Sequence, residues 1–132
     1  MKFLLIVTAV VEAATGLALL GLPSLVASLL LGASLDTSAA LVVARVGGAA
    51  LLSIGVSCWL ARDDQQSRAA TGLIAALLLY NIAAVAVLVY AGMGLGLSGI
   101  GPWPAVIVHA ALAAWCITCL RNQRANPSTT AG

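Results

Sequence analysis

The chain has 132 residues, of which 62% are hydrophobic and 8% are charged, and its formal net charge is +2. About one quarter of the residues in an ordinary soluble domain are charged, so this composition excludes that class. The few basic residues are not interleaved with aromatic ones, as a surface for single-stranded nucleic acid requires, so no nucleic acid partner is expected. Four apolar stretches fill most of the chain, and about 20 apolar residues suffice to cross a bilayer. The sequence therefore predicts an all-α fold, a four-span transmembrane helical bundle that forms one integral membrane domain over residues 1–132.

The first span is expected over residues 2–20. Its start resembles a signal peptide, whose apolar core is short. Here the apolar run continues past Glu12 as far as Leu20, which favours a first helix that is retained. Pro23 then ends or kinks the helix, because proline cannot donate the helical hydrogen bond. Residues 24–31 are apolar but too few to span, which indicates a short interfacial helix or a kinked extension.

The remaining spans are expected over residues 39–61, 69–91 and 104–120, followed by a polar tail over 121–132. Asp36 or Thr37 is the candidate N-cap of the second span. Residues 62–68 form the one markedly polar loop. Residues 92–101 are glycine-rich and uncharged, which predicts a loop near the level of the headgroups. They lack the lysine of a phosphate-binding loop, so no such site is expected.

Basic residues predict the orientation of the chain, because loops rich in lysine and arginine stay in the cytoplasm. Those in the loops and at the span ends all fall on one side of the expected topology: Lys2, Arg62, Arg68, Arg121 and Arg124. The opposite loops contain neither lysine nor arginine. We therefore expect a multi-pass protein of the inner (plasma) membrane with its N- and C-termini in the cytoplasm.

Each span carries a strongly polar residue, and such residues inside a membrane mark functional sites. On a rise of about 1.5 Å per residue and an apolar core of about 30 Å, their depths measured from the cytoplasmic side are similar. Glu12 lies at about 14 Å, Asn81 at about 18 Å, Arg45 at about 21 Å and His109 at about 22 Å on this scale. Tyr80 adjoins Asn81. The sequence thus predicts one substrate-binding cluster of Glu12, Arg45, Tyr80, Asn81 and His109.

An ion pair between Glu12 and Arg45 is the natural prediction within this cluster, because pairing relieves the cost of two isolated buried charges. Thr8, Thr15 and Gly16 share the face of Glu12 by their spacing of three and four residues. Three interpretations stay open. The cluster binds or moves a ligand, or it only holds the helices in register, or Arg45 extends to the interface beside an unpaired, protonated Glu12.

Metal and cofactor chemistry finds little support in the sequence. Cys58, Cys116 and Cys119 are odd in number and lie within spans, which argues against a disulfide framework. Cys116 and Cys119 are spaced as a C-x-x-C motif, but no second Cys or His pair completes a zinc site. His109 is the one histidine, so haem held by two histidines of this chain is excluded. We expect no metal and no cofactor.

Two families resemble parts of the chain. Glu12 to Pro23, then Leu30-Leu31-Gly32, then Ala44 to Gly48 resemble small uncharacterised bacterial four-helix membrane proteins of the DoxX-like group, and this resemblance implies a four-helix fold. The membrane glutamate of the first span also resembles that of the small multidrug resistance transporters, where it exchanges protons for cationic drugs. The chain departs from them because Arg45 would repel cations and a glycine follows Glu12 at four residues instead of three.

The sequence favours a small membrane protein that binds or transports a small solute or ion through the polar cluster. The first alternative is an accessory subunit of a larger membrane complex, and the second is a membrane enzyme acting on a lipid-like substrate. Enzymatic activity is not favoured, and no catalytic residues can be assigned from spacing. Small residues such as Gly48 and Gly55 predict close helix packing, within the bundle or in a homo-oligomer or complex.

Overall fold

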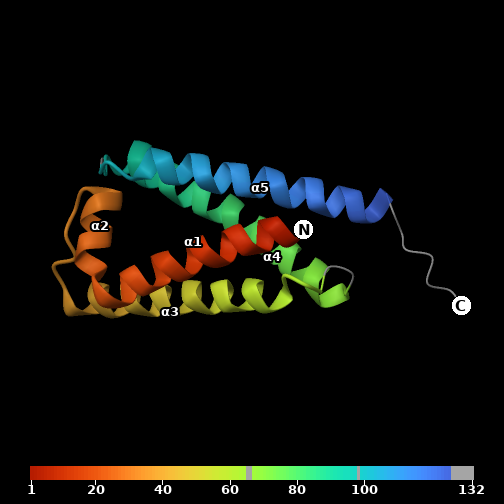
Figure 1. Ribbon diagram of the computed structural model, residues 1–132. Coiled ribbons are helices and arrows are strands. Elements are labelled where there is room, and N and C mark those ends of the chain that lie inside the picture. The colour runs from red at the N-terminus through yellow and green to blue at the C-terminus, as the bar shows by residue number, and fades with distance from the viewer. Residues whose placement is uncertain (65–66, 98, 126–132) are drawn as a thin grey trace, which may run out of the picture.

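The structure is a computed structural model that describes residues 1–64, 67–97 and 99–125. Those residues form five α-helices, of which the fourth continues into one π-helical turn (Figure 1). Their bounds are α1 Lys2–Gly21, α2 Pro23–Leu31, α3 Ser38–Ala61, α4 Arg68–Val89, η1 Tyr90–Gly94 and α5 Pro102–Ala125. Four of these helices, α1, α3, α4 (with its π-helical turn) and α5, are long and apolar enough to cross a membrane. The expected all-α class and its four candidate spans are confirmed.

The outer surface of the helices is apolar, as the surroundings of a membrane protein require. Val43, Leu60 and Leu79 expose about 70% of their surface. A soluble monomer rarely exposes contiguous apolar patches larger than a few hundred Å². The chain therefore has the features of a multi-pass membrane protein.

Side-chain caps account for two helix starts. Thr37 accepts a hydrogen bond from the amide of Ala40 at 3.1 Å, and Ser67 accepts one from the amide of Ala70 at 3.0 Å. Such caps satisfy amide groups that the first turn of a helix leaves without partners. Of the two expected caps of α3, the structure selects Thr37. At the other end of the chain, α5 runs to Ala125, and residues 126–132 of the expected tail lie outside the described residues.

The helices associate as two pairs, α1 with α3 and α4 with α5 (Figure 1). The first pair is antiparallel and so close that its backbones touch. A Cβ atom added to Gly16 would lie 2.6 Å from the carbonyl oxygen of Gly48, and one added to Gly55 would lie 2.9 Å from the amide nitrogen of Ala13. Small residues permit this approach. Gly48 and Gly55 thus form the small-residue interface that the sequence predicts.

A shared core joins the two pairs. It contains side chains from all four long helices, and these are Leu4, Leu5, Ala9, Cys58, Ile74, Leu77, Leu112, Cys116 and Cys119. Toward the end that carries Lys2, polar contacts add to the packing within each pair. The Lys2 ammonium lies 2.6 Å from the carboxylate of Asp63, and Thr71 on α4 donates a hydrogen bond to Gln123 on α5. Lys2 also lowers the pKa of Asp63 by donating this hydrogen bond.

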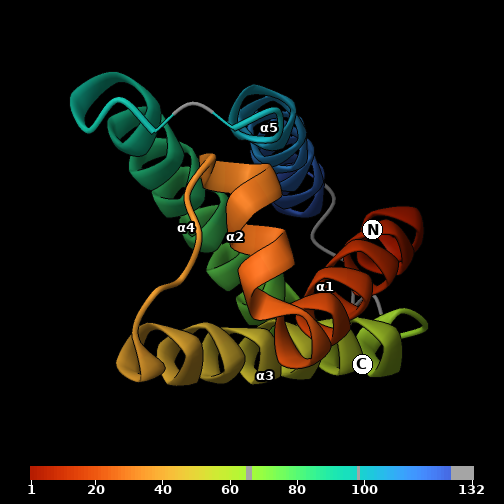
Figure 2. The same cartoon turned by 90° about the vertical axis from the view of Figure 1, so that its left-hand side faces the viewer.

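At the opposite end, α2 lies between the two pairs (Figure 2). It ends at Gly32, which takes the left-handed conformation with φ of 71°, a common helix stop. The loop before α5 packs on it, because the amide of Gly101 donates to the carbonyl of Leu29 at 2.9 Å. A Cβ atom at Gly99 would lie 2.6 Å from the same oxygen, so glycine is required for this contact. The short helix after the first span is thus present as a separate element.

Candidate functional site

The polar cluster lies where the two helix pairs meet, and α1 contributes two deeply buried polar side chains. Thr8 is 1% exposed and Glu12 is 2% exposed. The spacing of four residues places both side chains on one face of the helix. That face also carries Leu4, Leu5 and Gly16, all buried. Thr15, which the sequence placed on the same face, is exposed.

The carboxyl group of Glu12 is only half satisfied. Its Oε2 accepts a hydrogen bond from the hydroxyl of Tyr80 on α4 at 3.3 Å. Its Oε1 is buried and has no hydrogen-bond partner among the described residues, and the same is true of Thr8 Oγ1. A buried polar atom without a partner costs about 1–3 kcal/mol, so native proteins rarely leave one without a reason. Two such atoms one turn apart on one helix face are the most unusual feature of the cluster.

In the other half of the cluster, both polar side-chain atoms of Asn81 have hydrogen-bond partners. Asn81 is 1% exposed, and its amide nitrogen donates to the carbonyl of Leu77 at 2.7 Å. Its Oδ1 lies 2.8 Å from Nδ1 of His109 on α5. Because a carbonyl oxygen only accepts, the amide orientation is fixed, and His109 must carry its proton on Nδ1. The ring of Tyr80 meets that of His109 edge to face, with centroids 5.6 Å apart.

The predicted ion pair between Glu12 and Arg45 is wrong. Arg45 is exposed, and its Nε donates to the carbonyl oxygen of Leu20 at 3.3 Å. That carbonyl lies in the last turn of α1, where helix carbonyls lack intrahelical partners and a basic side chain is favourable. The salt bridges among the described residues all involve Asp63, with Lys2 and Arg62, and none reaches Glu12.

Helix register explains this error. The contact of Gly16 with Gly48, and that of Ala13 with Gly55, set Glu12 opposite the part of α3 just before Gly55. Arg45 lies two to three turns from that level, roughly 13 Å along the axis at 1.5 Å per residue. Depth counted from expected span ends placed the two residues only about 7 Å apart. Close glycine contacts, which set the register, are visible only in three dimensions.

The structure thus brings together Glu12, Tyr80, Asn81 and His109 and separates Arg45 from them. Sequence reasoning placed Thr8 on the face of Glu12 but did not make it a site residue, although its spacing of four residues was a usable signal. Ala113 and Cys116, four and seven residues after His109, share its face of α5 and are buried. All three cysteines are buried free thiols. The described part of the chain contains no group of three or more His, Cys, Asp or Glu residues placed to hold a metal ion.

Comparisons with known proteins leave the functional argument to this geometry. No family model matches the chain, and neither the curated proteins nor the solved structures gave a match.

Proposed function

We propose that this chain is a small integral membrane protein that binds or transports a small solute or ion at its intramembrane polar cluster. The observation that supports this most is the pair of buried atoms without partners, Glu12 Oε1 and Thr8 Oγ1. Both can accept a hydrogen bond or coordinate a positive charge. A ligand that supplies donors or charge there would remove the cost of leaving these atoms unpaired.

Charge narrows the proposed ligand to a proton or a small cation. Glu12 is the one acidic residue within the four long helices, and no cation of the described residues lies within 4.0 Å of it. An uncompensated carboxylate in apolar surroundings costs several kcal/mol, so the site is stable when it holds a proton or another positive charge. Arg45, which would repel cations, bonds to Leu20 instead. Arg45 therefore does not stand against a cationic ligand, as its expected place in the cluster had suggested.

The proposal includes an orientation in the inner membrane with both termini in the cytoplasm. Arg62 and Arg68 flank the turn between α3 and α4, and Lys2, Arg121 and Arg124 lie near the ends of α1 and α5 at the same end of the molecule (Figure 1). Lysine and arginine near span ends favour the cytoplasmic side. Glu12 then lies about halfway across the bilayer, the depth at which a transported ion has to be bound as it passes from one side to the other.

A second candidate is an accessory subunit of a larger membrane complex, in which the cluster only fixes the helices. The bonds of Asn81 favour it, because Leu77 and His109 give both of its polar side-chain atoms a partner without any ligand. Hydrogen bonds between membrane helices of this kind contribute about 0.6–2 kcal/mol. The two functions assign different roles to Glu12 and Thr8. A binding site uses Glu12 and Thr8, whereas a purely structural cluster has no use for their unpaired atoms.

Labelling with dicyclohexylcarbodiimide tests the binding function directly. This apolar reagent adds to a protonated carboxyl group, and the product is counted by mass spectrometry of the purified protein. The other acidic side chains, Asp36, Asp63 and Asp64, lie outside the helices, so a label within α1 reports Glu12. We expect labelling that falls as the pH rises, and that sodium, ammonium or methylammonium ions suppress at fixed pH. The Glu12→Gln variant is the control that removes the label.

Labelling that responds neither to pH nor to any of these cations would contradict the proposal and favour the structural function.

A second experiment tests transport, in proteoliposomes that enclose a pH-sensitive dye. An imposed gradient of the protecting cation, or of protons alone, should change the internal pH with the parent chain and not with Glu12→Gln. Far-ultraviolet circular dichroism and size exclusion must show that this variant folds. Loss of folding together with flux would indicate that Glu12 holds the bundle together.

A further inference from the structure

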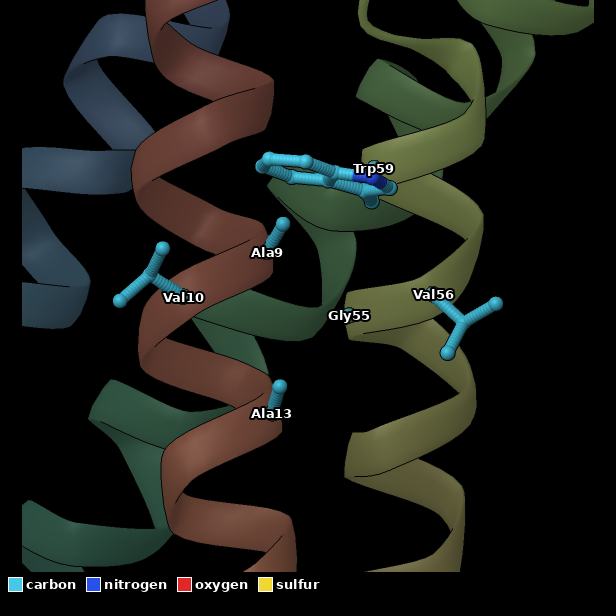
Figure 3. A pocket seen from close by; sticks show the side chains of 6 residues that line it. All are labelled: Ala9, Val10, Ala13, Gly55, Val56 and Trp59. Atoms are coloured by element: carbon cyan, nitrogen blue, oxygen red, sulfur yellow. The ribbon is translucent and has the colours of Figure 1, made fainter.

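An apolar groove lies on the α1–α3 pair (Figure 3), and none of its lining residues belongs to the polar cluster. It encloses about 250 Å³. Its lining consists of Ala9, Val10, Ala13, Gly55, Val56 and Trp59. Ala9 and Ala13 face Gly55 across the floor, while the indole of Trp59 reaches from α3 toward α1 and closes one end (Figure 3). Val10 is 58% exposed and Val56 is 50% exposed, so the groove opens to the surroundings of the protein.

A cation is fixed at the closed end of the groove. The guanidinium group of Arg62 stacks on the Trp59 ring, with its central carbon 4.1 Å from the ring centroid. Its Nη1 also donates to the carbonyl of Trp59 at 2.6 Å. Arg62 follows Trp59 by three residues, so it lies beyond the indole, toward the end of α3. An apolar groove, an aromatic ring and a cation thus follow one another along the helix axis.

The charge around Arg62 is positive on balance. Asp63 lies 3.4 Å from the Nε of Arg62, but it is also bound to Lys2 at 2.6 Å. Lys2, Arg62 and Arg68 carry three positive charges, against two negative charges on Asp63 and Asp64, which leaves +1 at this turn. The carboxylate that contacts Arg62, that of Asp63, is therefore already shared between two cations. The positive group of a zwitterionic headgroup would therefore be attracted only weakly by this carboxylate. An anionic headgroup, in contrast, is attracted by the excess positive charge.

We propose that this groove is a binding site for an anionic phospholipid, with an acyl chain along Ala13 and Gly55 and the phosphate at Arg62. The order of apolar groove, indole and guanidinium matches that of acyl chain, interface and headgroup in such a lipid. The groove covers about one turn of each helix, roughly 6 Å. That length accommodates part of one acyl chain, and it is shorter than a seam between two membrane-spanning helices. The site is separate from Glu12 and does not depend on the proposed function.

Quenching of Trp59 by brominated lipids tests the site. The protein is prepared with Trp103→Phe and Trp115→Phe, so that Trp59 alone fluoresces, and is placed in nanodiscs of phosphatidylcholine and phosphatidylglycerol. The acyl chains of one lipid or the other are brominated at equal mole fraction. We expect phosphatidylglycerol to occupy the site with a roughly fivefold preference, the ratio that about one surface cation provides. Equal quenching by the two lipids would overturn the proposal.

Three variants locate the preference. Arg62→Gln should abolish it, and Asp63→Asn should increase it, because it removes the carboxylate that competes for Arg62. Val10→Phe should reduce quenching by filling the groove, whereas Val42→Phe, an equally exposed site elsewhere, should not. An unchanged preference in both charge variants, or equal effects of the two phenylalanine variants, would refute the site. A second copy of the chain in the groove would shield Trp59 from both lipids and appear as a dimer in native mass spectrometry, which would also refute it.

Discussion

Replacing Gly48 with alanine adds a methyl group where the backbones of α1 and α3 touch. The new Cβ would lie 2.8 Å from the carbonyl oxygen of Gly16 and 3.0 Å from the amide nitrogen of Leu20. Ordinary van der Waals contact begins at about 3.4 Å. Because both neighbours are backbone atoms, no side chain can rotate away, and the helices must separate by about 0.6 Å.

The cost of this separation follows from overpacking. Extra methyl groups in a well-packed core cost about 1–3 kcal/mol, and the contacts along the α1–α3 seam weaken together. The neighbouring residue provides the matched control, since a Cβ at Gly47 would meet nothing within 4 Å. Gly47→Ala should be neutral or stabilising, because alanine favours a helix over glycine by about 0.5–1 kcal/mol.

Reversible unfolding in mixed micelles, followed by circular dichroism, measures both variants. We expect Gly48→Ala to lower the free energy of unfolding by about 1–3 kcal/mol relative to Gly47→Ala. Equal stabilities of the two variants would refute the close contact between α1 and α3, and with it the register that separates Arg45 from Glu12.

Two further predictions concern the polar residues. A double-mutant cycle of Asn81→Ala and His109→Ala, measured by unfolding in micelles, should give a coupling free energy of about 0.5–2 kcal/mol; a coupling near zero would show that the 2.8 Å contact does not form. Arg45→Gln should leave carbodiimide labelling of Glu12 unchanged, because the guanidinium group bonds to Leu20. A large change in labelling would instead indicate that Arg45 acts on the carboxyl group directly.

Hydropathy predicted the helices well, because a membrane span is a local property of the chain. Thr37 marked a helix start and Pro23 marked the end of the first helix, both through interactions within a few residues. The π-helical turn that extends α4 to Gly94 had no comparable signal, since glycine-rich apolar sequence suits a loop equally well. Local chemistry thus determined which segments are helical. It did not determine where α4 ends, because the composition after Val89 suits a helix and a loop equally well.

Only part of the polar cluster was predictable. A common depth brought Glu12, Asn81 and His109 together, because depth depends on position within each span. The partner of Glu12 was not predictable, because it depends on which backbones touch and hence on glycine contacts far apart in the sequence. Hydrogen bonding is equally nonlocal. Nothing in the sequence distinguishes Asn81, whose polar side-chain atoms both have partners, from Thr8, whose hydroxyl has none among the described residues.

The central claim is that the cluster contains buried polar atoms whose hydrogen-bond partner is a ligand. The free energy of unfolding of the Thr8→Val variant tests this claim most directly. Valine has nearly the same shape as threonine and removes the unpaired hydroxyl. The control is Thr118→Val, at an exposed threonine whose hydroxyl donates to the carbonyl of Trp115 at 2.7 Å. In ligand-free micelles we expect Thr8→Val to be as stable as the parent or more stable by up to about 1–3 kcal/mol. A loss of more than about 1 kcal/mol would show that the hydroxyl is bonded in the folded protein and would contradict the account.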